Sequence, residues 1–225
     1  MNEDGTTAAI ILAAGSSSRM GGGRHKLLLP LDERPVLAHV IDAALASRAR
    51  PVVVVLGHRA GQVRAEVAAY LEQPGIIVVE NPDYLQGMST SMHVGLATLV
   101  EGTYQGVGQQ EQSQVGVDSA LIMLGDQPLI TAQVIDALIS ARRASGKRIV
   151  AALYGGKRGN PTLFAASLFG ELMEVTGDEG GRRVLERHRE EVESVELGDA
   201  AASFDVDTWE AYQEVVEMWE RKKEE

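Results

Sequence analysis

A glycine- and serine-rich segment with two cations follows the first apolar run of the chain, residues 8–13. The segment reads A-A-G-S-S-S-R-M-G-G-G-R-H-K over residues 13–26. Gly15 permits a left-handed backbone and close approach of a ligand to the chain, and successive N–H groups of such a turn form a concave anion site. Arg19 and Lys26 bring two positive charges to the same loop. The segment therefore predicts a phosphate-binding loop.

Two well-known phosphate loops do not fit this segment. A Walker A loop needs Lys followed by Ser or Thr, whereas Leu27 follows Lys26. A dinucleotide fingerprint needs Gly-x-Gly-x-x-Gly and an acid after the second strand, whereas Gly15 is alone before Arg19 and residues 56–58 read L-G-H. A P-loop kinase and an NAD enzyme are thus disfavoured, and a solvated glycine loop is the simplest alternative.

Two aspartates complete the candidate chemistry. Asp126 follows the apolar run 120–124 within G-D-Q-P, in which Gly125 gives the backbone freedom to turn. Because a lone carboxylate would repel a triphosphate, Asp126 suits Mg²⁺, which takes one or two carboxylates plus phosphate oxygens. Asp207 of D-V-D-T is the candidate second ligand, with Asp205 on the same side of an extended segment. The structural alternatives are a turn former at Asp126 and a helix cap at Asp207.

These residues need a scaffold that joins distant segments. Short runs rich in β-branched residues predict strands at 8–13, 52–56, 76–80, 120–124, 149–153 and, more weakly, 192–197. Helical spacing of apolar residues lies between them, at 36–45 after Pro35, 63–71, 88–100 and 134–141. This alternation predicts a three-layer α/β fold with a mostly parallel central sheet. Ligands of such sheets bind beyond the carboxyl ends of the strands, where the Gly15 loop and Asp126 would meet.

Length and composition favour a single domain over residues 1–225. The chain is 44% hydrophobic, enough for a packed core. Residues 1–7 are polar and predict a flexible terminus, and residues 101–117, rich in Gly, Gln and Ser, predict a mobile loop. Residues 207–225 predict a C-terminal helix that begins with a capping box of Asp207 and Glu210.

Charge and cysteine content exclude several functions. The net charge of −11 disfavours nucleic-acid and anionic-membrane partners. The absence of cysteine removes disulfides, cysteine-ligated zinc and thiol nucleophiles. The acidic start MNEDGTT is unlike a signal peptide, and the apolar runs are too short to span a membrane, so we expect a cytoplasmic protein. Against this background stands one basic cluster: Arg19, Arg24, His25 and Lys26.

Taken together, these motifs resemble the MobA-like nucleotidyltransferases. L-A-A-G-S-S-S-R-M-G, a following lysine, G-D-Q-P, R-G-N-P, G-D-E-G-G-R and D-V-D-T occur in the family's order over residues 8–212. The Ala-Ala-Gly opening and G-D-Q-P look most like molybdenum cofactor cytidylyltransferases, whereas guanylyltransferase relatives typically carry Gly-Gly in the first motif. The resemblance implies a Rossmann-like nucleotidyltransferase fold.

The resemblance also implies a reaction. CMP would pass from CTP to the terminal phosphate of molybdopterin with Mg²⁺ as cofactor, and pyrophosphate would leave. Arg19 and Lys26 would contact the phosphates, and Asp126 and Asp207 would hold the metal. The implied nucleotide-binding residues are Leu12, Ala13, Ala14, Gly15, Ser16, Arg19, Lys26 and Gly125. Such phosphoryl transfer depends on positioning and charge stabilisation and needs no protein nucleophile.

Other residues are implied to contact the acceptor: Ser89 and Ser91 at a helix start, Arg158 and Asn160 of R-G-N-P, and Arg182 of G-D-E-G-G-R. Plain helix caps are an equally good explanation for the two serines, and an exposed basic turn for Lys157 and Arg158. The family often has His where this chain has Asn160, which cannot titrate, so the acceptor's identity stays open. The stretch from Met20 to Lys26 is about one residue longer than usual, which predicts a more flexible loop.

Two other functions stay open. One is the same chemistry with GTP or another nucleotide, or on another phosphate acceptor such as a sugar or alcohol phosphate. The other is a non-catalytic maturation factor that delivers the cofactor to a molybdoenzyme. The presence of Arg19, Lys26, Asp126 and Asp207 together counts against the second function.

Overall fold

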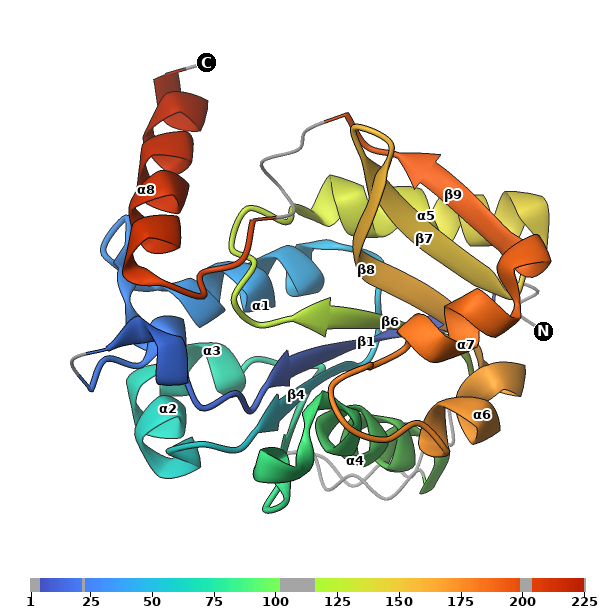
Figure 1. The fold of residues 1–225 in the computed structure, drawn as a ribbon, viewed down its shortest axis with the longest axis horizontal. Helices are drawn as coiled ribbons and strands as arrows, with labels where there is room; N and C mark the ends of the chain where they lie inside the picture. Colours follow the sequence, from blue (N-terminus) through green and yellow to red (C-terminus); the bar gives the residue numbers. More distant parts are fainter. Residues whose placement is uncertain (1–4, 22, 102–115, 199–203, 225) are drawn as a thin grey trace.

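A seven-stranded sheet forms the centre of the computed structural model, which describes residues 5–21, 23–101, 116–198 and 204–224 (Figure 1). Its strands are β1 (Thr6–Ala13), β4 (Val52–Leu56), β5 (Ile76–Glu80), β6 (Val117–Leu124), β7 (Ile149–Tyr154), β8 (Lys157–Ala165) and β9 (Val192–Glu196). They lie in the order β5-β4-β1-β6-β8-β7-β9, and β8 runs antiparallel to both its neighbours. The other neighbouring strands pair in parallel, which confirms the mostly parallel sheet.

Helices cover both faces of the sheet. They are α1 (Val36–Ala46), α2 (Ala60–Glu66), α3 (Ala68–Leu71), α4 (Met88–Glu101), α5 (Ala132–Ser145), α6 (Phe169–Met173), α7 (Arg182–Arg187) and α8 (Trp209–Glu224). Apolar residues of α1, α2, α3 and α5 share one core with the sheet, and those of α4, α6 and α7 share the other. The predicted three-layer fold is therefore confirmed. Strands β2 (Pro30–Leu31) and β3 (Arg34–Pro35) form a separate short hairpin.

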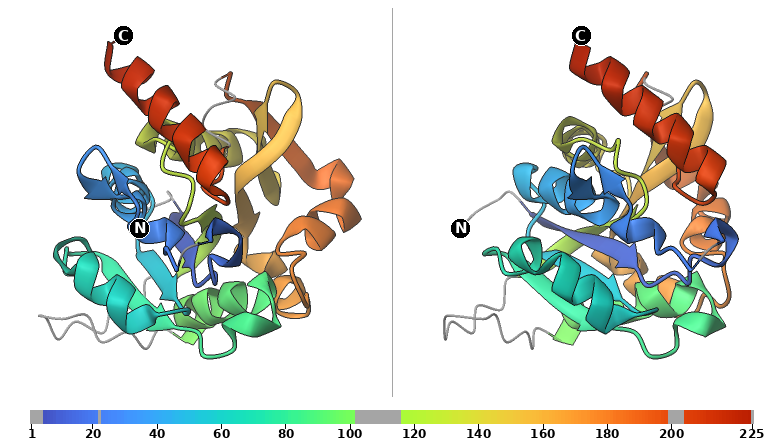
Figure 2. Two further views of the ribbon diagram at one scale, coloured as in Figure 1. Left: turned by 60° about the vertical axis from the view of Figure 1, so that its left-hand side comes forward. Right: turned by 90° about the vertical axis from the view of Figure 1, so that its left-hand side faces the viewer.

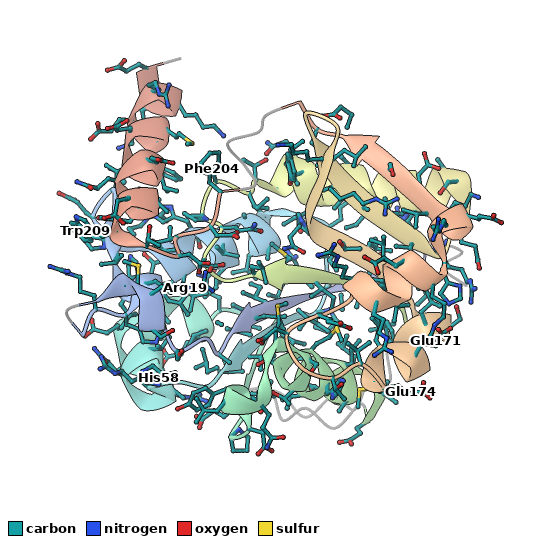
Figure 3. All side chains as sticks on the ribbon, in the orientation of Figure 1. Arg19, His58, Glu171, Glu174, Phe204 and Trp209 are labelled. Atoms are coloured by element: carbon teal, nitrogen blue, oxygen red, sulfur yellow. The ribbon has the colours of Figure 1, made fainter. Side chains whose placement is uncertain are left out.

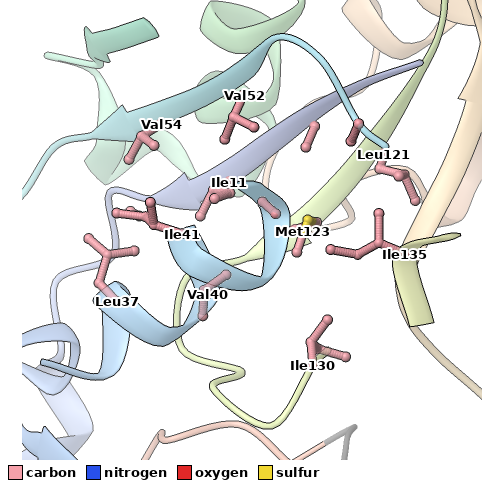
Figure 4. Packing of buried hydrophobic residues seen from close by; sticks show 14 of the residues in the cluster. Ile11, Leu37, Val40, Ile41, Val52, Val54, Leu121, Met123, Ile130 and Ile135 are labelled. Atoms are coloured by element: carbon pink, nitrogen blue, oxygen red, sulfur yellow. The ribbon is translucent and has the colours of Figure 1, made fainter. Parts of the chain in front are cut away.

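Residues 8–13 of strand β1 show why the central strands are rich in apolar residues. Successive side chains point to opposite faces, so Ile10 and Leu12 enter the α4 core while Ile11 enters the α1 core. Figure 4 shows Ile11 facing Leu37 and Ile41 of α1. From Ala8 to Ala13 both faces of the strand are buried and carry apolar side chains, so polar groups gather beyond its carboxyl end.

Strand β8 was not predicted, because its sequence reads K-R-G-N-P before T-L-F-A. Proline lacks the N–H that a central strand needs. The structure accommodates it at a register shift, where Ala151 pairs with Thr162 and Ala152 pairs with Gly159, so that the two residues between, Asn160 and Pro161, stand outside the ladder. The predicted turn at 157–158 is therefore the start of a strand.

The predicted ends of the chain need three corrections. Strand β1 begins at Thr6, and Thr7 Oγ1 bonds Ser119 Oγ at 2.8 Å, so these two residues are not a flexible terminus. Residues 1–4 lie outside the described residues, as do residues 102–115 of the predicted loop.

Helix α8 begins at Trp209, two residues after the predicted start. Its cap is Thr208, whose Oγ1 accepts the Ala211 N–H at 3.2 Å, and not the predicted capping box of Asp207.

Helix α8 builds a third core beside the glycine-rich loop. Val215 is fully buried against a cluster that also contains Met20, Leu29, Leu31, Val36, Leu129 and Val206. The Tyr212 hydroxyl donates to the carbonyl of Pro30. The carboxyl end of the helix extends beyond the body of the molecule (Figure 2). Helix α8 thus packs on the segment that carries the candidate phosphate loop.

Candidate active site

The carboxyl ends of β1 and β6 lie side by side and carry the two main motifs. Leu12 pairs with Leu124, and the Gly125 N–H donates to the Leu12 carbonyl at 2.9 Å. A Cβ on Gly125 would stand 3.2 Å from both the Ala13 Cβ and the Leu12 carbonyl oxygen. Glycine therefore lets the G-D-Q-P turn close onto β1, which places Asp126 beside the loop that follows Ala13.

The segment before α8 reaches the same edge. The N–H of Val206, a fully buried residue, donates to the Asp126 carbonyl at 3.0 Å. With Val206 pointing inward, its neighbours Asp205 and Asp207 both line the same cavity, as the predicted alternation requires. A backbone hydrogen bond between residues 80 positions apart in the sequence thereby brings these aspartates into one site.

The four charged residues predicted for the chemistry meet here. Lys26 Nζ donates both to Asp126 Oδ2 and to Asp207 Oδ1, the latter at 2.6 Å. Arg19 Nη1 donates to Asp207 Oδ2 at 2.8 Å. The Lys26 side chain is only 14% exposed, whereas that of Arg19 is 72% exposed. One buried ammonium therefore bridges the two carboxylates, and an exposed guanidinium stands at the rim, beyond the ends of β1 and β6 (Figure 3).

Burial and charge act in opposite directions on these groups. Burial lowers the pKa of Lys26, but the carboxylates of Asp126 and Asp207 outweigh it and the pKa is raised. Burial raises the pKa of Asp207, but Lys26 and Arg19 outweigh it and the pKa is lowered. Burial and the nearby charge of Asp126 raise the pKa of Asp205 to about 6, although it accepts a hydrogen bond from Gln127.

A cavity of about 640 Å³ opens above this cluster. Besides the four charged residues, it is lined by the predicted nucleotide-binding residues Leu12, Ala13, Ala14, Gly15 and Ser16. Gly125 packs beneath it and does not line it. The residues of the loop described with positive φ are Ser17, Gly21 and Gly23, so Gly15 does not use the left-handed conformation that glycine permits. A Cβ on Gly15 would meet no atom within 4 Å, which leaves room for a ligand.

A second cavity, of about 520 Å³, adjoins the first. The predicted acceptor residues Arg158, Asn160 and Arg182 line it, whereas Lys157 lines neither cavity. Arg182 is already paired with Glu186 at 3.0 Å. The two cavities have four lining residues in common: Leu12, Met88, Leu124 and Asp178. The candidate nucleotide and acceptor residues thus line two adjoining spaces with a common wall.

The serines at the start of α4 play a different part from the one predicted. Ser89 is buried and lines neither cavity, and Ser91 lines the first cavity while its Oγ accepts from Asn81 Nδ2 at 2.9 Å. The N–H groups of Met88 and Ser89 are bonded to Asp178 and Gly177. Asp178 and Gly177, and not the serine side chains, therefore accept from these amides, and this speaks against both a serine cap and an anion site at these two N–H groups.

Only part of the basic cluster Arg19, Arg24, His25 and Lys26 contributes positive charge to the first cavity. His25 is buried and stacks on His58 with ring centres 5.8 Å apart, and burial lowers its pKa, so it adds no positive charge near neutral pH. The Arg24 guanidinium lies over the Trp209 ring at 4.6 Å. Arg19 and Lys26 are therefore the cations of the cluster that line the first cavity.

The donor set suits one hard divalent ion. Asp126 and Asp207 contact the same ammonium, so their oxygens lie close enough to hold one small cation. Among the described residues, no group of three or more His, Cys, Asp or Glu side chains forms a metal site. Two carboxylates with further ligands from phosphate and water are the coordination typical of Mg²⁺ in nucleotide enzymes.

Tyr84 and Leu85 line the first cavity and were not predicted. Asp178 lines both cavities and belongs to the G-D-E-G-G-R motif, in which Arg182 was the named candidate. Residues 84 and 85 belong to no motif or spacing pattern in the sequence. Their place depends on how the start of α4 packs, which is a tertiary property.

Comparison with known proteins places the chain in a family. Residues 9–192 match the MobA-like NTP transferase domain. The bifunctional protein GlmU of Anaeromyxobacter sp. (strain K) is 33% identical over 137 residues, which cover 60% of this chain and 25% of that protein. The chain thus matches only about a quarter of the length of GlmU.

Solved structures agree with this result. Rv0371c from Mycobacterium tuberculosis H37Rv superimposes with a TM-score of 0.76 and 28% identity, covering 95% of this chain and 99% of that one. Its manganese complex gives a TM-score of 0.71 at 27% identity, covering 94% and 98%. Molybdopterin-guanine dinucleotide biosynthesis protein A from Archaeoglobus fulgidus shares the fold, with a TM-score of 0.64 at 13% identity over 95% and 99% of the two chains. Since the family match spans most of its length, this chain belongs to the MobA-like NTP transferase family.

Proposed function

We propose that this protein transfers CMP from CTP to the terminal phosphate of molybdopterin and releases pyrophosphate. The observation that carries the proposal is the pair of adjoining cavities, with the Lys26-bridged aspartates in the first. A transfer between two substrates requires two binding spaces that adjoin where the reacting atoms meet. These two cavities adjoin, since they share lining residues.

The proposed roles follow from charge and place. Residues 12–16 would receive the nucleotide, and Arg19 and Lys26 would contact its phosphates. Asp126 and Asp207 would hold Mg²⁺, which supplies charge neutralisation on the phosphates when it is bound. The manganese in the Rv0371C complex supports a divalent ion in this family.

Arg158 is the preferred contact for the acceptor's phosphate, because Arg182 is paired with Glu186. An acceptor phosphate oxygen would attack the α-phosphorus of CTP. The bond from that phosphorus to the bridging oxygen would break, and its electron pair would leave with pyrophosphate. The attacking phosphate oxygen is already anionic, so no side chain has to remove a proton.

The choice of CTP and molybdopterin rests on the resemblance of L-A-A-G and G-D-Q-P to the cytidylyltransferase branch. The test is pyrophosphate release with each of the four NTPs, Mg²⁺ and molybdopterin. We expect turnover with CTP. Turnover with GTP alone would overturn the base, and turnover only with a sugar or alcohol phosphate would overturn the acceptor. Tight binding of molybdopterin without turnover of any NTP would favour delivery to a molybdoenzyme.

A further inference from the structure

The turn of residues 177–182, which joins α6 to α7, docks on the start of α4 (Figure 1). The Met88 N–H donates to Asp178 Oδ1 at 3.0 Å, and the Ser89 N–H donates to the Gly177 carbonyl at 2.9 Å. The first N–H groups of a helix have no partner within the helix. Here they find partners about ninety residues away in the sequence, so the two segments are tied together.

The backbones of these segments touch. A Cβ on Gly87 would stand 2.5 Å from the Gly177 carbonyl carbon, and Gly87 itself has a φ of +111°. On the far side of the turn, a Cβ on Gly181 would stand 2.6 Å from the Phe164 ring of β8. The turn is therefore wedged between α4 and β8, and it cannot shift without moving one of them.

Asp178 and Met88 stand in the wall that the two cavities share. On one side of this pair, Gln86 and Gly87 line the first cavity. On the other side, Arg182 and its neighbours line the second. The Asp178–Met88 hydrogen bond therefore joins an element of the nucleotide cavity to an element of the acceptor cavity.

We propose that Asp178 is a positioning residue that holds the acceptor cavity in register with the nucleotide cavity through its hydrogen bond to Met88. The inference rests on the proposed function, because it needs the two cavities to hold the two substrates. Group transfer requires the attacking oxygen in line with the leaving group, and a misplacement of about 1 Å costs on the order of 100-fold in rate. A loosened turn would produce such a displacement while both cavities persist.

The kinetic test compares three variants with the wild type on the substrate pair that turns over. Asp178→Ala should lower kcat/KM for the acceptor by about tenfold or more, with KM for the nucleotide changed far less. Asp178→Asn should restore it, because the amide oxygen still accepts from the Met88 N–H. Thr131→Ala is the control: it removes the cap of α5, where Thr131 Oγ1 accepts the Val134 N–H at 3.4 Å, and lines neither cavity.

The control separates positioning from stability. Thr131→Ala should lower the melting temperature but leave both kinetic constants unchanged. An Asp178→Ala variant that loses stability and keeps wild-type kinetics would overturn the proposal, as would an Asp178→Asn variant as slow as Asp178→Ala.

Amide hydrogen exchange gives a readout besides activity. CTP with Mg²⁺ should slow exchange in residues 12–19 and also in residues 177–182 of the wild type, and the second effect should be lost in Asp178→Ala. Protection of residues 12–19 alone would overturn the coupling and leave the proposed function standing. If no NTP protects residues 12–19, the proposed function fails and the inference fails with it.

Discussion

The ammonium of Lys26 lies between the carboxylates of Asp126 and Asp207, in the place that a bound metal ion would take. It bonds both Asp126 and Asp207, so a divalent ion that binds the same oxygens has to displace it. The displaced lysine would then be free to meet the phosphates of an incoming nucleotide. The geometry therefore predicts competition between Lys26 and a metal ion in the absence of nucleotide.

Lys26→Gln should tighten Mn²⁺ binding to the nucleotide-free protein by about tenfold, because a competing charge in a half-buried site is removed. Free Mn²⁺ measured by electron paramagnetic resonance gives the affinity. The double variant Lys26→Gln, Asp126→Asn should lose the gain. An unchanged affinity in Lys26→Gln, with weakened binding in Asp126→Asn, would show that the metal site exists without this competition.

Asp126→Ala should lower turnover by about 100-fold or more, since one metal ligand is lost. The fold should survive, because Lys26 keeps Asp207 as a partner. Pyrophosphate release and the melting temperature are the two measurements. Asp136→Ala is a matched control, as this aspartate pairs with Arg48 at 3.4 Å and lines neither cavity. Wild-type turnover in Asp126→Ala would remove this residue from the metal site.

At the scale of elements, the second half of the glycine-rich loop is held by contacts on two sides. His25 stacks on His58, and the Arg59 guanidinium donates to the Gly23 carbonyl at 2.9 Å. Met20, in the middle of the loop, lies in the core built by α8. These contacts should limit the flexibility that the sequence predicts for this half of the loop.

The His25 anchor should make stability depend on pH. Burial lowers the folded-state pKa of His25 below its ordinary value of 6.5. As the pH falls, the unfolded chain therefore binds a proton at His25 near pH 6.5, before the folded protein does. The contribution of the neutral His25 to the free energy of unfolding is complete above pH 6.5 and is lost as the pH falls through the folded-state pKa. His25→Gln should lose less free energy of unfolding between pH 7 and about 5.5 than the wild type does, as measured by urea unfolding. Equal losses in the two proteins would refute this role.

Helix α8 should stabilise the loop through Val215. Val215→Ala removes two buried methyl groups and leaves a cavity, which costs about 2 kcal/mol of unfolding free energy. Because Met20 packs in the same cluster, KM for the nucleotide should rise as well. Urea unfolding and steady-state kinetics check the two effects. The exposed Glu214 on the same helix provides the control, and Glu214→Ala should change neither.

At the scale of the whole molecule, the charge is negative, and the first cavity is no exception. The chain carries a net charge of −11, and the cavity contains the cations Arg19 and Lys26 beside the carboxyl groups of Asp126, Asp178, Asp205 and Asp207. A polyphosphate is therefore expected to bind there together with a divalent cation, whereas the overall field repels a long polyanion. None of the described helices has the length and apolar character needed to cross a membrane.

The protein should therefore not bind DNA even at low ionic strength. Non-specific DNA binders have dissociation constants of about 10⁻⁴ to 10⁻⁶ M at physiological salt and bind more tightly at lower salt, and we expect a value weaker than this range here. Fluorescence anisotropy of a labelled duplex at about 50 mM salt measures it. A rise in anisotropy that disappears with added salt would contradict the predicted repulsion.

Much of the fold could be predicted from local patterns. Strands such as residues 52–56 are apolar throughout, and this pattern depends only on burial of both faces. Strand β8 was not predicted because Lys157, Arg158 and Pro161 are atypical of a central strand. The proline fits only because the pairing with β7 shifts register at that point. Short helices such as α6 and α7 carry too few residues for a helical period to emerge.

The sequence by itself determined the candidate chemistry of the site, because residue types and motif order point to a candidate phosphate loop, two aspartates and their cations. The tertiary structure alone decided how those groups meet. Lys26 bridges two aspartates 100 and 181 positions away, and only the sheet and a backbone bond from Val206 bring them together. Tertiary packing also buries His25, so that this residue adds no positive charge to the basic cluster, and it places Asp178 in the lining of both cavities. Distances and desolvation are properties of the packed chain, and no spacing along the sequence contains them.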